Sequence, residues 1–263
     1  MARVIPGLAM AGLWLVLLLQ GSFLLFYPVL LLGALIAARE FVSMSCSKSS
    51  SMEQWLFSSI LITPLLFLAF QDPRLLVPGL LSAFLILSIY SIHSYTDAQQ
   101  TFQMISRVGL GLFYIGFLAA HLVLIFDLEN GNRWLIVLTA ITAGSDSGAY
   151  YCGRRFGRRK LCPLISPNKT VEGAVGGVVS GVLAGVIMAL LVCKDFQFSF
   201  LLPVAACLAV IGIYGDLSES ILKRATATKD SGTILAGHGG VLDRMDSLLF
   251  AGPVLYYLLL LQG

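Results

Sequence analysis

Residues 207–246 read CLAVIGIYGDLSESILKRATATKDSGTILAGHGGVLDRMD, an apolar run that changes at Asp216 into a strongly polar segment. From Asp216 to Asp246 the segment holds five acidic residues, four basic residues, one His and four Gly. A charged cluster directly beside hydrocarbon is costly unless it lines a site. The stretch therefore predicts a membrane-spanning helix that leads into a functional region.

The whole chain shares this apolar character. Hydrophobic residues make up 57% of its 263 residues and charged residues only 12%, and its mean hydropathy is +0.88. Because soluble domains have about a quarter charged residues, we expect an integral membrane protein without a large soluble domain. Runs of Lys and Arg that bind nucleic acid are missing. The five scattered cysteines predict neither a disulfide framework nor a zinc site.

Apolar runs bounded by charged residues or by Pro and Gly predict nine membrane spans. The runs are Val4–Leu19, Phe23–Ala38, Trp55–Phe70, Leu75–His93, Met104–Phe126, Trp134–Cys152, Val171–Cys193, Phe200–Gly215 and Ser247–Leu261. The expected fold is an all-α polytopic membrane bundle of about nine transmembrane helices, with a polar cleft open to the cytoplasm. We expect N-terminal transmembrane helices in residues 1–126 and a catalytic region in residues 127–263.

The first two runs lie very close together in the sequence. Only Gln20, Gly21 and Ser22 separate them, so a hairpin or one broken element is the alternative. The first run resembles a signal peptide but lacks a convincing cleavage site, which favours a retained helix.

The distribution of basic residues supports nine spans. With nine spans, 14 of the 17 Lys and Arg residues lie at the N-terminus and in the even-numbered loops, and only Arg74, Arg133 and Lys194 lie on the other side. The positive-inside rule then makes the even-numbered side cytoplasmic. Both polar stretches, 145–172 and 216–246, fall on that side. We expect the site to face the cytoplasm, in the inner membrane if the source is bacterial.

The segment from Asp216 to Arg224 is predicted to be helical. A helix places Asp216, Ser220 and Lys223 on one face and allows a Glu219–Lys223 ion pair. A plain helix start with Asp216 as its cap is the alternative. Asp216 also follows an apolar run, which is typical of a metal ligand at the membrane boundary.

The segment from Lys229 to Asp246 combines a Gly-rich loop with two carboxylates. Glycines surround His238, so the backbone there can offer N–H groups to an anion. In the helix predicted over VLDRMDSLLF, Asp243 and Asp246 are three residues apart. Together with Asp216 they supply hard oxygen ligands that suit Mg²⁺. The alternative is a loop that leads into a capped final helix.

A third polar group lies between Gly144 and Gly173. Asp146 sits inside an apolar span, where an acidic residue is a functional candidate. Ser166 or Asn168 is expected to cap the next helix, whose N-terminus, with Lys169, favours a phosphate. The basic run from Arg154 to Lys160 is interpreted either as a topological anchor or as a binder of anionic lipid.

The residues between 143 and 247 resemble the phosphatidate cytidylyltransferase (CDP-diacylglycerol synthase) family. The following residues are in register with its C-terminal signature: Ser220, Lys223, Arg224, Lys229, Asp230, Gly232, Leu235, His238, Gly239, Gly240, Asp243, Arg244 and Asp246. Ala236 departs from the pattern, where Pro or Gly is usual. The N-terminal half matches only as a hydrophobic bundle.

This resemblance implies transfer of CMP from CTP to phosphatidate, which gives CDP-diacylglycerol and pyrophosphate, with Mg²⁺ required and K⁺ as a second cation. The implied catalytic residues are Asp216, Lys223, Arg224, Lys229, Asp230, His238, Asp243, Arg244 and Asp246. The implied substrate-binding residues are Ser166, Asn168, Lys169, Glu172, Ser220, Gly239 and Gly240, and the metal ligands are Asp216, Asp243, Asp246 and Asp146.

Two other functions stay open at this point. A membrane kinase or nucleotidyltransferase that acts on a polyprenol or an archaeal lipid would keep the polar sites. A transporter would also use buried Asp and Lys with Gly-rich helices. The expected partners are CTP, phosphatidate and the bilayer, without nucleic acid. Glycines at 173, 176, 177 and 181 indicate a close helix interface within or between subunits, which leaves a homodimer open.

Overall fold

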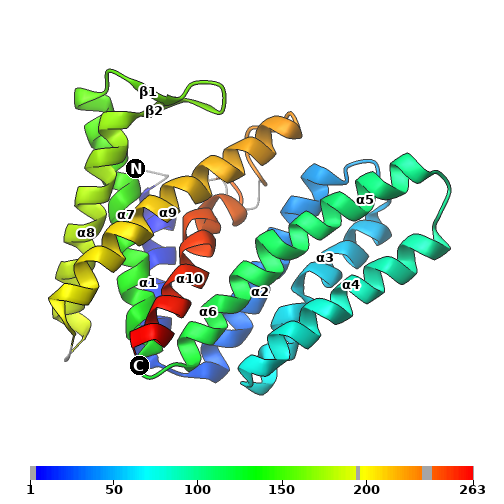
Figure 1. Ribbon diagram of the computed structural model, residues 1–263, viewed down its shortest axis with the longest axis horizontal. Helices are drawn as coiled ribbons and strands as arrows, with labels where there is room; N and C mark the ends of the chain where they lie inside the picture. Colours follow the sequence, from blue (N-terminus) through cyan, green and yellow to red (C-terminus); the bar gives the residue numbers. More distant parts are fainter. Residues whose placement is uncertain (1–3, 194–195, 233–238, 263) are drawn as a thin grey trace. The chain divides into compact units, whose positions relative to one another are not determined.

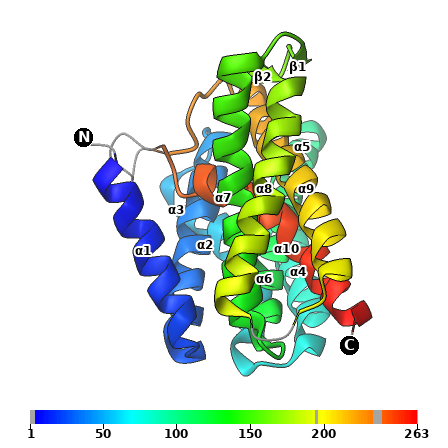
Figure 2. The same ribbon diagram turned by 90° about the vertical axis from the view of Figure 1, so that its left-hand side faces the viewer.

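The computed structural model describes residues 4–193, 196–232 and 239–262 of the chain (Figures 1 and 2). These residues are mostly helical, as expected for an all-α membrane protein. The one sheet in the described part is a small antiparallel hairpin of β1 (Lys160–Cys162) and β2 (Ser166–Thr170). This hairpin is not predicted by the sequence pattern, because its strands are short and carry no alternation of apolar residues.

The described chain packs as two compact units. The first unit contains α1 (Val4–Gln20), the segment Ile125–Ala227 and the chain from Arg244 onward. The second unit contains the segments Ser22–Leu124 and Thr228–Asp243. Neither unit is one continuous stretch of sequence, and we describe each by itself.

In the first unit, α7 (Gly131–Phe156), α8 (Val171–Val192) and α9 (Phe198–Ala225) lie side by side (Figures 1 and 2). The hairpin β1–β2 lies at one end of α7 and α8 (Figure 1). The helix α10 (Leu242–Gln262) contributes its residues from Arg244 onward. On α1, the Trp14 indole N–H donates to the Thr139 hydroxyl of α7 at 3.1 Å.

The contact between α7 and α8 depends on glycine. The buried face of α8 carries small residues at every fourth position: Gly173, Gly177, Gly181, Gly185 and Ala189. A Cβ atom on Gly181 would lie 3.0 Å from the Ile141 backbone oxygen of α7. The Ser180 hydroxyl donates to the Gly144 carbonyl oxygen at 3.0 Å. The predicted small-residue interface therefore forms within one chain, and a homodimer stays a prediction.

The second unit is built from the N-terminal helices. They are α2 (Phe23–Ser45), α3 (Ser51–Phe67) with η1 (Leu68–Phe70), η2 (Pro73–Leu75) with α4 (Leu76–His93), and α5 (Ala98–Gly111), which continues through the π-helical η3 (Leu112–Phe117) into α6 (Leu118–Asp127). The residues of α6 up to Leu124 belong to this unit. Ser50 and Glu53 form a capping box at the start of α3. A Cβ atom on Gly116 of η3 would overlap the Leu61 backbone oxygen, so glycine permits the close approach of η3 to α3.

Within the described residues, seven helices are long and apolar enough to cross a membrane. They cover Phe23–Ser45, Ser51–Phe70, Pro73–His93, Ala98–Asp127, Val171–Val192, Phe198–Ala225 and Leu242–Gln262. The predicted runs in α1 and α7 are also helical, but these two helices are not among the seven. An all-α polytopic membrane protein is therefore confirmed, while nine spans stay a prediction.

Candidate functional site

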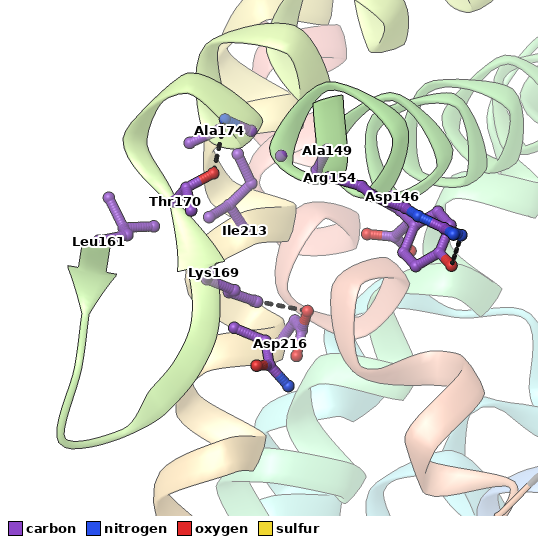
Figure 3. Close-up of a pocket in the computed structure, with 13 residues that line it drawn as sticks. Asp146, Ala149, Arg154, Leu161, Lys169, Thr170, Ala174, Ile213 and Asp216 are labelled. Carbon is purple, nitrogen blue, oxygen red and sulfur yellow. Dashed lines mark hydrogen bonds and ion pairs between the residues drawn. The ribbon is translucent and has the colours of Figure 1, made fainter. Parts of the chain in front are cut away.

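A pocket of about 470 Å³ lies in the first unit, at the end of α7 and α8 that carries the hairpin (Figure 3). Its volume is in the range of small-molecule sites. The lining residues are Asp146, Ala149, Tyr150, Gly153 and Arg154 of α7, Leu161 of β1, Asn168, Lys169 and Thr170 of β2, Gly173 and Ala174 of α8, and Ile213 and Asp216 of α9. Four of them are predicted site residues.

An ion pair joins two sides of this pocket. The Lys169 ammonium on β2 lies 2.5 Å from Asp216 Oδ2 on α9, and both side chains are partly buried, at 24% and 35% exposed (Figure 3). Asp146 on α7 is close enough to interact electrostatically with both groups. The pocket therefore holds two carboxylates and one ammonium, a set that can bind a cation and a phosphate together.

Asp246 of α10 lies near these carboxylates. A Cβ atom on Gly215 would lie 2.8 Å from the Asp246 backbone oxygen, so glycine allows α9 to approach α10 immediately before Asp216. The Asp246 side chain is 7% exposed and interacts electrostatically with Asp216 and Asp146. Its Oδ1 accepts the Ser247 backbone N–H at 2.7 Å. The packing of α9 on α10 thus gathers three predicted metal ligands in one region.

The hairpin contains the predicted substrate-binding residues Ser166 and Asn168, but neither of them caps α8. The cap of α8 is Thr170, whose hydroxyl accepts the Gly173 N–H at 3.1 Å. The expectation that Ser166 or Asn168 caps this helix is wrong, because both lie in β2 and the helix starts later. Ser166 is half-buried, whereas Asn168 is exposed in the pocket.

Glu172, at the start of α8, forms hydrogen bonds with the backbone that follows α7. Its carboxylate accepts the backbone N–H groups of Arg158 at 2.9 Å and Arg159 at 3.2 Å. Both oxygens of Glu172 take part, since Oε1 also lies 3.3 Å from the Arg159 nitrogen. In this structure Glu172 therefore holds the backbone between α7 and β1, and it is not one of the residues that line the pocket.

The helical face predicted after Asp216 is confirmed, because α9 continues to Ala225. The predicted ion pair also forms, with Lys223 Nζ 2.9 Å from Glu219 Oε2, and the Glu219 side chain is only 1% exposed. Ser220 is half-buried, and Arg224 is exposed and donates to the Ile165 carbonyl oxygen at 3.3 Å. Lys223 is thus balanced by a buried carboxylate.

The remaining signature residues belong mostly to the second unit. Lys229 and Asp230 are exposed, and Gly239 has a φ of +79°, which favours glycine. Asp243 Oδ2 accepts the backbone N–H groups of Gly240 at 2.7 Å and Ser231 at 3.0 Å. Arg244, at the start of the first unit's part of α10, is exposed. His238, with Leu235 and Ala236, lies outside the described residues.

The chemistry of the pocket fits Mg²⁺. Within the described residues, no three His, Cys, Asp or Glu side chains stand together as a ready metal-binding group. Mg²⁺ is usually held by one or two carboxylates together with substrate phosphates and water, so a larger protein cluster is not required. Asp146 and Asp216 supply that number of hard oxygen ligands at the pocket.

Two residues with contacts in these regions were not predicted as site residues from the sequence. Arg154, interpreted as an anchor or a lipid binder, lines the pocket and donates to the Tyr150 hydroxyl at 3.3 Å. Its position one helical turn after Tyr150, on the face that carries Asp146, is a signal that could have assigned it to the pocket. Glu40 was missed as well, although it is a buried acidic residue in α2 with 4% exposure.

Comparison with known proteins gives one consistent result. A family model described as "Cytidylyltransferase family" matches residues 1–262. The chain is 34% identical to the phosphatidate cytidylyltransferase of Staphylococcus haemolyticus, over 91% of this chain and 95% of that protein. It is 33% identical to that of Staphylococcus epidermidis, over 98% of both chains. It is 41% identical to that of Bacillus subtilis, over 61% of this chain and 60% of that protein.

Proposed function

This chain belongs to the cytidylyltransferase family, and we propose that the pocket of its first unit is where CMP transfer takes place. The chain transfers CMP from CTP to phosphatidate, which yields CDP-diacylglycerol and pyrophosphate for phospholipid biosynthesis. The observation that supports the location is the Lys169–Asp216 pair, with Asp146 beside it, in a pocket of about 470 Å³.

The reaction requires two anionic substrates to come together. A phosphate oxygen of phosphatidate attacks the α-phosphorus of CTP, a new P–O bond forms, and the bond to pyrophosphate breaks. Phosphate monoesters are already largely ionised near neutral pH, so the attacking oxygen needs no strong general base. The protein must instead reduce the repulsion between the phosphates. Lys169 and Arg154 are the cationic side chains at the pocket that suit this role.

The carboxylates of the pocket suit a divalent cation. We propose Asp146 and Asp216, with Asp246 close by, as the residues that hold Mg²⁺. The metal would neutralise charge on the triphosphate and on the leaving pyrophosphate. Asp243 as a further ligand and K⁺ as a second cation stay predictions. In this arrangement Asp216 would be a ligand of the metal, and the Lys169 ammonium, which pairs with Asp216 in the structure, would face a substrate phosphate.

Separate reactions with two differently labelled forms of CTP test this function. Purified protein in detergent is incubated with phosphatidate, Mg²⁺ and CTP labelled either at the α- or at the γ-phosphorus. We expect the α-label in the lipid and the γ-label in released pyrophosphate, and no release when phosphatidate or Mg²⁺ is omitted. A γ-label in the lipid would indicate a kinase instead, and transfer to a polyprenol phosphate in preference to phosphatidate would indicate a related nucleotidyltransferase.

We propose that the chain crosses the membrane nine times and that its polar cleft opens to the cytoplasm. This arrangement predicts that Cys162 in β1 is cytoplasmic and that Cys193, after α8, is on the opposite side. Two single-cysteine variants, with the other cysteines replaced by Ala, test it with a membrane-impermeant maleimide. We expect the Cys162 variant to react only in inside-out vesicles and the Cys193 variant only in right-side-out vesicles. The reverse pattern, or reaction of both on one side, would contradict the orientation.

A further inference from the structure

Glu40 lies in the second unit, near the end of α2, and its carboxylate holds the start of α10. Oε1 accepts the backbone N–H of Val241 at 3.1 Å, and Oε2 accepts that of Leu242 at 2.9 Å. The Glu40 side chain is only 4% exposed. A buried carboxylate at a helix N-terminus is stabilised by the unpaired N–H groups and by the helix dipole. Such a charge is costly to bury without these donors.

Ser231 links Glu40 to Asp243. The Ser231 hydroxyl lies 2.9 Å from Asp243 Oδ2 and 3.3 Å from Glu40 Oε2. The same Oδ2 accepts the backbone N–H groups of Ser231 and Gly240. Three amides at the start of α10, those of residues 240, 241 and 242, are therefore occupied by Glu40 and Asp243. A substrate oxygen would bind these amides only by displacing a carboxylate.

Two glycines of the signature are fitted around the Glu40 side chain. A Cβ atom on Gly232 would overlap Glu40, and its three nearest atoms would all be atoms of that side chain. A Cβ atom on Gly240 would overlap both Ser231 Oγ and Glu40 Oε2. The space that glycine leaves at 232 and 240 is thus taken by one carboxylate. This gives the glycines a packing role that needs no contact with substrate.

From these contacts we infer that Glu40 is a positioning residue for CMP transfer, which acts through the signature segment and not on the substrates. It fixes two pieces of backbone that precede Asp243 in the chain, one at Ser231–Gly232 and one at Val241–Leu242. The inference rests on the CMP-transfer activity proposed above. Small displacements of groups that orient a reaction reduce its rate strongly, even when they lie away from the reacting atoms.

The isosteric variant Glu40→Gln tests this role. Glu40 accepts a backbone N–H on each oxygen, whereas Gln has one acceptor oxygen and one NH₂ group that must face a donor. We expect kcat to fall about ten- to hundredfold, with the KM for CTP changed less than about threefold. The matched control is Glu53→Gln, whose carboxylate accepts the Ser50 N–H and the Tyr90 hydroxyl in the same unit. We expect the control to keep wild-type kcat.

A second measurement does not depend on activity. Thermal unfolding in detergent is compared for Gly232→Ala, Glu40→Ala and the double variant. Because the added Cβ meets only Glu40 among its nearest atoms, we expect Gly232→Ala to destabilise the wild type but not the Glu40→Ala protein. Additive effects would overturn the inference, as would an unchanged kcat in Glu40→Gln. The wild-type rate with labelled CTP tests the proposed function separately, so the two failures are distinguishable.

Discussion

Asp216→Asn is expected to reduce CMP transfer about 10²–10³-fold, the loss typical of removing one preorganised electrostatic group from an active site. Asn keeps the size of Asp216 but removes the charge that faces Lys169 at 2.5 Å and lies near Asp146. The loss of one carboxylate should also weaken the binding of Mg²⁺. The measurement is the rate of pyrophosphate release as a function of Mg²⁺ concentration, and we expect half-saturation to shift to higher Mg²⁺.

A control and a double variant show which role of Asp216 matters. Asp72→Asn changes a half-buried carboxylate outside the pocket that caps η2 by accepting the Arg74 N–H, and Asn caps helices about as well. We expect it to keep wild-type activity. If the only role of Asp216 is to neutralise the charge of Lys169, the double variant Lys169→Met/Asp216→Asn should be more active than Asp216→Asn alone. We expect no such recovery, because in our proposal both side chains act on the substrates.

The helices could be predicted from the sequence because the membrane imposes a simple rule. A span needs about 20 apolar residues, and each predicted run lies, to within a residue, inside a helical segment. The rule fails at the ends of helices. The run after Phe23 was predicted to end at Ala38, but α2 continues to Ser45. Ala, Arg and Glu are good helix formers, so a loss of hydropathy does not end a helix. Glu40 was missed because it lies in that extension.

The site was predictable in its residue types but not in its pairings. The charged residues of the polar stretches stood out because the rest of the chain is apolar. Which of them meet depends on packing between distant segments, such as the contact of Lys169 on β2 with Asp216 on α9. Local motifs also mislead when an unpredicted element uses the same residues. The hairpin takes up Ser166 and Asn168, so the cap of α8 moved to Thr170.

Gly177→Val is expected to be the most destabilising of the substitutions considered, because it separates α7 from α8. A Cβ atom at residue 177 would lie 2.9 Å from the Ser145 backbone oxygen and 3.1 Å from the Ala149 Cβ. Backbone cannot move aside as a flexible side chain can. Overpacking of this kind costs about 3 kcal/mol, or about 6–12 °C in Tm for a chain of this size. The measurement is thermal unfolding of the purified protein in detergent.

Gly109→Val in α5 is the matched control, since a Cβ atom at Gly109 would meet no atom within 4 Å. Val has a higher helix propensity than Gly, so the control should change stability by less than about 0.5 kcal/mol. An equal loss of Tm in both variants would show that glycine at 177 does not serve close packing. A loss of Tm in the Gly177 variant alone would show that close packing of α7 on α8 stabilises the protein. The same two helices line the pocket, where they carry Asp146 and Gly173. Separating the two helices should then lower CMP transfer even at temperatures where the protein remains folded.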